Sequence, residues 1–135
     1  MSRLLLDTHV FLWWVADDPN LPAMARQAIA DVNNECCLSL ASCREIVIRT
    51  SLGKLRLTMP VGRFLTEQLA ANGFSLLPIE LRHAARVAKL PFHHRAPFDR
   101  LLIAQAITEK LTMVTADSLF SNYGVTTLWQ PPPAR

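Results

Sequence analysis

Five short apolar runs along the chain end abruptly at polar residues, and each has the length of a buried β-strand. They cover residues 3–6, 36–39, 74–78, 111–115 and 125–129. Between them lie segments that fit helices, at residues 10–15, 22–32, 41–52, 61–71, 80–89 and 97–109. Strands that alternate with helices predict right-handed crossovers and a mainly parallel sheet covered on both faces. We therefore expect an α/β fold with about five strands.

The domain organisation follows from the same pattern. No internal repeat or composition shift divides the chain, so we expect one domain over residues 1–130. The tail at residues 131–135 contains three consecutive prolines, which cannot continue a hydrogen-bonded ladder. It is predicted to lie outside the fold.

Composition narrows the class of protein. Half of the 135 residues are hydrophobic, yet no apolar run is long enough to cross a bilayer. The amino terminus lacks the basic and long apolar parts of a signal peptide, so we expect a cytoplasmic protein without a membrane partner. A net charge of +3 is compatible with a nucleic-acid partner without establishing one. Cys36, Cys37 and Cys43 form no Cys-x-x-Cys pair, which favours ordinary thiols over disulfides or zinc ligands.

The predicted helix at 97–109 begins with an acid in an apolar setting. Pro97 suits the first helical turn, and Asp99 follows within that turn. Because desolvating an unpaired carboxylate is expensive, Asp99 requires either a salt bridge or a bound cation. Three other acids bear on this choice. Asp7 ends the first strand, Asp117 ends the fourth, and Glu45 lies one turn into the helix after the second.

These four acids are expected to meet in one cleft. In open parallel sheets, ligands bind outside the carboxyl ends of the strands, and all four acids belong to elements that reach this edge. Taken singly, each has a simpler explanation as a helix cap, a turn residue, a surface charge or a salt-bridge partner. Convergence explains all of them together, provided that the sheet is parallel.

Converging carboxylates repel one another and need hard cations to stay ionised together. Mg²⁺ and Mn²⁺ prefer oxygen ligands, polarise phosphoryl oxygens and lower the pKa of bound water, so the chemistry implied is metal-assisted phosphodiester hydrolysis. Thr8 and Thr115 lie beside the acids and could orient them, or act only as caps. Arg95 and Arg100 border the predicted cleft, where they could contact substrate or pair with the acids.

Several segments between Arg3 and Trp129 match the pattern of one protein family. They are LLLDTH at 4–9, SCREI at 42–46 with LGKL at 52–55, HRAPFDRLLIAQA at 94–106, VTAD at 114–117, and the closing stretch at 123–129. In these segments the chain resembles the PIN-domain ribonucleases, specifically the VapC-like toxins of bacterial type II toxin–antitoxin pairs. The resemblance implies an α/β/α sandwich and a metal-dependent endoribonuclease using Mg²⁺ or Mn²⁺. Its metal-binding and catalytic acids would be Asp7, Glu45, Asp99 and Asp117.

The resemblance also implies partners. These are an RNA substrate, a second copy in a homodimer, and a cognate antitoxin that can build a higher toxin–antitoxin assembly. In relatives, the antitoxin tail lies in a groove near the first helices and blocks the metal site. The exposed aromatic cluster of Phe11, Trp13 and Trp14 is predicted to form part of that groove.

Two positions depart from the family pattern. Arg44 stands where close relatives usually have Trp, and Ala96 stands where they usually carry an acid. The second departure removes a charge beside the predicted site and could weaken one metal position.

Two other Mg²⁺-dependent α/β folds fit the sequence less well. Receiver domains and haloacid-dehalogenase-type phosphatases need a second acid close to the one that ends the first strand, whereas Thr8 and His9 follow Asp7. The stronger rival is a catalytically weak or inactive PIN-like module that only binds RNA or protein.

Overall fold

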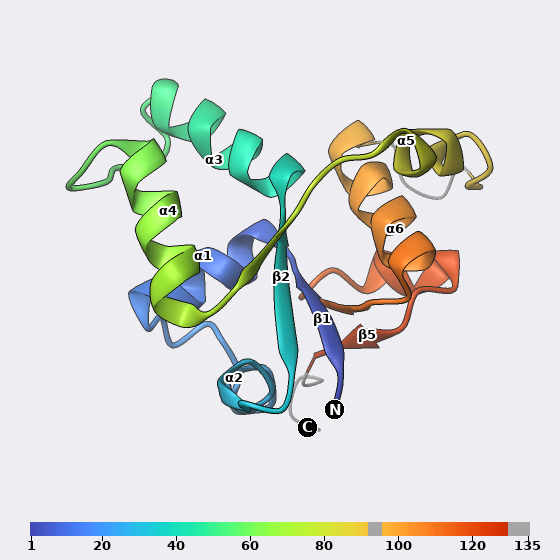
Figure 1. Ribbon diagram of the computed structural model, residues 1–135, viewed down its shortest axis with the longest axis horizontal. Coiled ribbons are helices and arrows are strands. Elements are labelled where there is room, and N and C mark those ends of the chain that lie inside the picture. The colour runs from blue at the N-terminus through green and yellow to red at the C-terminus, as the bar shows by residue number, and fades with distance from the viewer. Residues whose placement is uncertain (92–95, 130–135) are drawn as a thin grey trace, which may run out of the picture.

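A computed structural model describes residues 1–91 and 96–129. It contains a five-stranded sheet in the order β3-β2-β1-β4-β5, in which every neighbouring pair is parallel (Figure 1). The strands are β1 (Arg3–Leu6), β2 (Glu35–Ser39), β3 (Ser75–Leu77), β4 (Thr112–Val114) and β5 (Thr127–Leu128). The predicted strands and their parallel pairing are confirmed. The third, fourth and fifth are shorter than their apolar runs because pairing does not extend to the run ends.

All six predicted helices are present, with ends that differ by a few residues. They are α1 (Thr8–Ala16), α2 (Ala23–Ala30), α3 (Leu40–Ser51), α4 (Val61–Asn72), α5 (Leu81–Val87) and α6 (Pro97–Glu109). A short 3₁₀ helix, η1 (Ser118–Tyr123), follows β4. Gly73 ends α4 in the left-handed conformation (φ 66°), which favours glycine, and this confirms the predicted stop.

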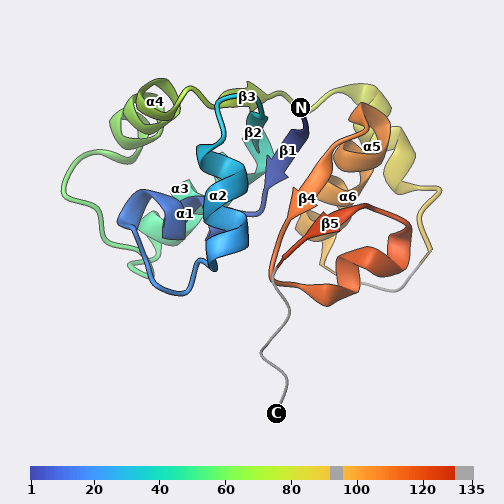
Figure 2. The ribbon, with the colours of Figure 1, turned by 90° about the horizontal axis from the view of Figure 1, so that it is seen from below.

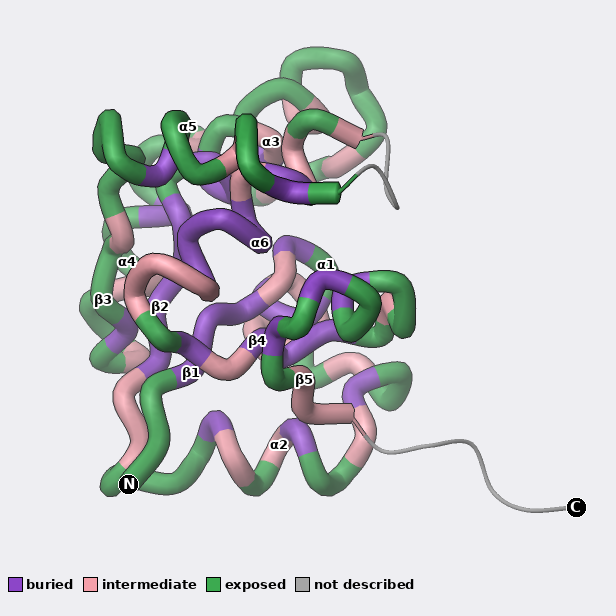
Figure 3. The backbone as a smooth tube through the Cα atoms, turned by 90° about the vertical axis from the view of Figure 1, so that its right-hand side faces the viewer, coloured by how far each residue is buried: buried purple, intermediate pink, exposed green. Residues whose placement is uncertain are grey.

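Two apolar cores lie on opposite faces of the sheet. Successive strand residues point to opposite faces, so Leu4 and Leu6 join one core whereas Leu5 joins the other. Phe11 of α1 belongs to the first core, and Ile103 of α6 belongs to the second. Figure 2 shows the elements from below, and Figure 3 shows most of β1, β2 and β4 and much of α6 as buried, whereas the edge strands β3 and β5 are more accessible. This is the expected α/β/α sandwich.

The register of the strands aligns their carboxyl ends at one edge. Leu6 of β1 pairs with Leu38 of β2 on one side and with Val114 of β4 on the other. The next residues, Asp7, Ser39 and Thr115, therefore lie side by side at this edge. Within the described ranges, no helix is long and apolar enough to cross a membrane. The predicted boundary at residue 130 and the tail at 131–135 lie outside the described residues.

Candidate active site

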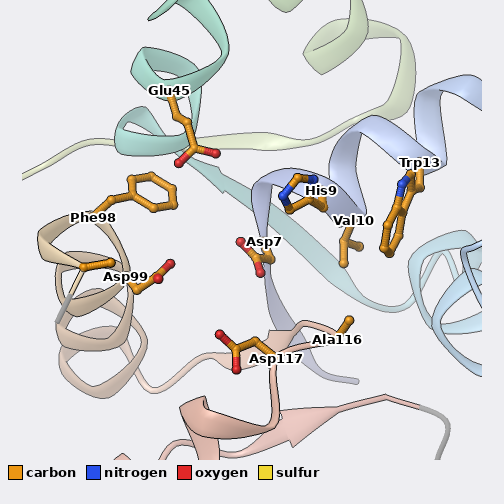
Figure 4. Close-up of a pocket in the computed structure, with 10 residues that line it drawn as sticks. Asp7, His9, Val10, Trp13, Glu45, Phe98, Asp99, Ala116 and Asp117 are labelled. Atoms are coloured by element: carbon orange, nitrogen blue, oxygen red, sulfur yellow. The ribbon is translucent and has the colours of Figure 1, made fainter. Parts of the chain in front are cut away.

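A cleft of about 530 Å³ opens at this edge of the sheet. Its described lining contains all four acids predicted from the sequence, and Figure 4 shows their carboxylates around one space. The described residues that line it are Asp7, His9, Val10, Trp13, Glu45, Ala96, Phe98, Asp99, Ala116 and Asp117. The acids come from α1's cap, α3, α6 and the segment after β4. Residues far apart in sequence thus form one acidic site.

Asp7 is held at both carboxylate oxygens. It is the N-cap of α1, where Oδ1 accepts a hydrogen bond from the backbone N–H of Thr8 at 2.8 Å. Oδ2 accepts a hydrogen bond from the hydroxyl of Thr115 at 2.8 Å. Backbone and side-chain donors therefore fix the plane of this carboxylate without neutralising its charge.

Asp117 is connected to Asp7 through the same threonine. The hydroxyl oxygen of Thr115 accepts a hydrogen bond from the backbone N–H of Asp117 at 3.0 Å. Asp117 in turn caps η1, since its Oδ1 accepts from the backbone N–H of Leu119 at 2.9 Å. Thr115 is almost fully buried, whereas the two acids that it connects line the cleft.

A buried polar contact joins the two helices that carry the remaining acids. Ser39 caps α3, with its hydroxyl accepting from the backbone N–H of Ala41 at 3.0 Å. The same hydroxyl donates to Oε1 of Gln105 on α6 at 2.6 Å. Glu45 lies on α3, and Asp99 lies in the first turn of α6. The Ser39–Gln105 contact therefore helps to set how these two acids face each other.

The donor set fits a hard divalent cation. Carboxylate oxygens are the ligands that Mg²⁺ and Mn²⁺ prefer. Among the described residues, no lysine or arginine lies within salt-bridge distance of Asp7 or Glu45. Because no basic side chain in the described part of the chain compensates these two carboxylates, a bound cation would stabilise their charged forms.

The family of this chain follows from a comparison with sequence models of protein families. The family model described as "PIN domain" matches residues 4–125, nearly the whole chain. The chain belongs to the PIN-domain family.

Individual proteins agree with this assignment. This PIN domain is 33% identical over 118 residues to Ribonuclease VapC22 of Mycobacterium tuberculosis, which covers 87% of this chain and 88% of that protein. The VapBC2 structure from Rickettsia felis bound to a promoter DNA fragment superposes with a TM-score of 0.71 at 16% identity, covering 94% of this chain and 98% of that one. FitAcB from Neisseria gonorrhoeae gives 0.66 at 21% identity, covering 92% and 95%. The resemblance predicted from the sequence is confirmed.

Two predicted supporting residues act differently in this PIN domain. Arg100 does not line the cleft: it is buried, and its guanidinium donates to the backbone carbonyls of Val87, Leu90 and Pro91 at 2.8–3.2 Å. Neighbouring helix residues point about 100° apart, so Arg100 turns away when Asp99 faces the cleft. The buried Thr8 hydroxyl has no hydrogen-bond partner among the described residues, so only its backbone N–H orients Asp7.

The predicted aromatic cluster divides into buried and accessible members. Phe11 is fully buried between Phe64 and Phe74, so the expectation that it is exposed in a groove is wrong. Trp14 is partly buried, and its indole N–H donates to Oδ1 of Asn72 at 3.0 Å. Trp13 lines the cleft. Arg95 lies outside the described residues.

A second group of ligand-type side chains lies away from the cleft. Glu80, His83 and Glu109 place one ligand atom each within 4.8 Å of one another. Arg82 forms ion pairs with both glutamates, and Nε2 of His83 lies 2.8 Å from Oε2 of Glu109. Nδ1 of His83 accepts a hydrogen bond from the backbone N–H of Glu80. The protein therefore already compensates these charges, and the group joins α5 to α6.

The three cysteines are free and buried. Burial raises the pKa of the Cys36 thiol to about 11 and that of Cys37 to about 12, with Glu35 adding to both shifts. Thiols with such pKa values are protonated at neutral pH and are poor metal ligands. The interpretation of these residues as ordinary thiols is consistent with this.

Proposed function

We propose that this PIN domain is a metal-dependent endoribonuclease that cleaves RNA phosphodiester bonds as the toxin of a toxin–antitoxin pair. The observation that carries the proposal is the convergence of Asp7, Glu45, Asp99 and Asp117 on one cleft. The name of the relative from Mycobacterium tuberculosis, a VapC ribonuclease, supports the choice of RNA. Since its substrate is cellular RNA, the proposal places the protein in the cytoplasm.

The four acids would hold Mg²⁺ or Mn²⁺. Such an ion, when bound, polarises a phosphoryl oxygen and lowers the pKa of a bound water. The chain's own contribution is to keep the carboxylates in place. Thr115 and the N–H of Thr8 fix Asp7, and the Ser39–Gln105 contact relates α3 to α6.

The proposed protein partner is an antitoxin. One structure with this fold is described as a toxin–antitoxin complex from Klebsiella pneumoniae, and another as a member of the VapBC family of toxin–antitoxin systems, which supports a small protein partner for this chain. Trp13 of α1 lines the same cleft as the acids, so an antitoxin tail that blocks the cleft would pass it. Because Phe11 is buried, it contributes to such a groove only by supporting α1.

We further propose that two copies form a homodimer. Four apolar side chains of α3 or its end are 37–62% exposed, which is a large apolar surface for one helix: Leu40, Val47, Ile48 and Leu52. Light scattering on the purified chain tests this. A monomeric mass at micromolar concentration would contradict the dimer without affecting the nuclease proposal.

RNA cleavage by the purified protein, freed of any co-purifying partner, tests the nuclease proposal. A structured RNA is incubated with Mg²⁺ or Mn²⁺ beside Asp7→Asn and Asp99→Asn, with Glu67→Gln on α4 as an exposed control acid. We expect cleavage by wild type and Glu67→Gln that requires metal and disappears in the other two variants. Wild type that binds RNA but leaves it intact with either metal would favour the rival binding module.

A further inference from the structure

A row of three aromatic rings ends at the acidic cleft. His9 and Trp13 are one helical turn apart on α1, with ring centroids 6.0 Å apart and planes at 32°. Trp13 also lies against Trp129, which follows β5, at 6.1 Å and 41°. Both tryptophans pack on the first core, whereas His9 is exposed. The core therefore anchors the row, and its free end is the imidazole of His9.

Two rings of this row form one wall of the cleft, and a fourth ring lies across the acids. His9 and Trp13 both line the cleft, close to Asp7. Phe98 lines the opposite side, beside Asp99 (Figure 4). The carboxylates thus lie between aromatic side chains.

The charge of the cleft limits how it can bind a nucleic acid. No lysine or arginine is among the described residues that line it, and four of the lining residues are acids. The walls formed by these described residues repel the RNA backbone, except at a phosphate held by a bound cation. The aromatic rings in these walls can instead bind the flanking nucleotides by stacking on their bases.

We propose that His9, backed by Trp13 and Trp129, is a stacking subsite for one unpaired base next to the scissile phosphate. Phe98 offers a second ring across the acids. Bases in a duplex are covered by their neighbours, so only a single-stranded or unpaired nucleotide can reach His9. The substrate of this site is therefore unpaired RNA, an inference that rests on the proposed nuclease function.

Fluorescence anisotropy with labelled oligonucleotides tests the subsite. The ligands are single-stranded octaadenylate, an abasic ribose-phosphate chain of the same length, and the octaadenylate–octauridylate duplex. The parent protein carries Asp99→Asn, which separates binding from turnover. It is compared with double variants that also carry His9→Ala or His9→Phe. Met24→Ala on α2 removes an exposed apolar side chain that does not line the cleft and is the matched control.

Loss of stacking should appear only with unpaired bases. We expect His9→Ala to weaken octaadenylate binding about tenfold, and His9→Phe and Met24→Ala to stay within about twofold of the parent. Affinity for the abasic chain and the duplex should not change. An equal loss on the abasic chain would overturn the proposal, because His9 would then contact phosphate. Unchanged octaadenylate binding by His9→Ala would overturn the proposal as well. The aromatic row would then be a contact for a protein side chain and not for a base.

The outcome is independent of whether the protein cleaves RNA. Binding is measured in the Asp99→Asn background, whereas the nuclease proposal is tested by metal-dependent cleavage with Asp99 intact. A base-dependent effect of His9 without any cleavage would retain the subsite and reject the nuclease.

Discussion

The hydroxyl of Thr115 donates a 2.8 Å hydrogen bond to Oδ2 of Asp7, although the two residues are 108 positions apart in sequence. The contact exists because β1 and β4 are adjacent and in register, so both strands end at the same edge. Asp7 is the proposed metal ligand, and Thr115 fixes its orientation. Partners that orient a ligand in this way strongly affect metal affinity.

Replacing Thr115 by valine keeps the shape of the side chain and removes this donor. We expect Thr115→Val to weaken Mn²⁺ binding about tenfold, and Thr115→Ser, which keeps the hydroxyl, to retain most of the affinity. Calorimetric titration with Mn²⁺ measures both. Equal affinities in wild type and Thr115→Val would contradict the orienting role.

Ala96 allows a test of the departure from the family pattern. It lines the cleft and is the N-cap of α6, with extended backbone angles (φ −69°, ψ 117°) that suit a capping side chain. Ala96→Ser and Ala96→Asp should each stabilise the fold by about 1 kcal/mol in urea unfolding. Only Ala96→Asp should also tighten Mn²⁺ binding, because it alone adds a carboxylate to the cleft. Tighter binding in both variants would mean that helix order, rather than charge, is responsible.

Arg100 is expected to contribute to stability and not to substrate binding. Its guanidinium donates to three backbone carbonyls in the connection between α5 and α6. Arg100→Met leaves those acceptors without this donor, so the free energy of unfolding should fall by about 3 kcal/mol. The exposed Arg86→Met on α5 should change it by less than about 0.5 kcal/mol. Urea unfolding followed by tryptophan fluorescence measures both, and equal values for the two variants would refute the assignment.

The strands and the acidic edge could be predicted because the signals are local. Each apolar run is followed by its polar residue in the sequence, and parallel pairing brings those residues together. The burial of Phe11 could not be predicted, since it depends on Phe64 of α4 and on Phe74, which directly precedes β3. Gln105 gave a weak signal as a polar residue within an apolar helix, but its partner Ser39 lies 66 positions away.

Arg100 shows how a sequence neighbour misleads. It was expected to border the cleft together with Arg95, yet it follows Asp99 directly, and consecutive helix residues do not share a face. Helix geometry predicts that Arg100 and Asp99 point in different directions. It does not predict which carbonyls accept hydrogen bonds from Arg100, because those carbonyls lie in a connection without a regular sequence pattern.

The cluster that joins α5 to α6 predicts a pH dependence of stability. The hydrogen bond from His83, together with Arg82, lowers the pKa of Glu109 below its ordinary value of 4.5, against the effect of burial. A carboxyl whose pKa is depressed by folding stabilises the fold above its unfolded pKa, and this contribution disappears as the pH falls through the folded pKa. The free energy of unfolding should therefore decrease below about pH 5. Glu109→Gln should reduce that decrease in urea titrations at several pH values, and an unchanged pH dependence would contradict the cause.

We expect the carboxylates of the cleft to hold the divalent ion, and not those of the cluster of Glu80, His83 and Glu109 that joins α5 to α6. Titration with Mn²⁺, followed by the electron paramagnetic resonance signal of the free ion, tests this most directly. It compares wild type with Asp7→Asn, Glu45→Gln, Asp99→Asn, Asp117→Asn and the control Glu109→Gln. We expect wild type and Glu109→Gln to bind Mn²⁺ alike and each cleft variant to bind it at least about tenfold more weakly. Binding that survives in Asp7→Asn and is lost in Glu109→Gln would contradict it.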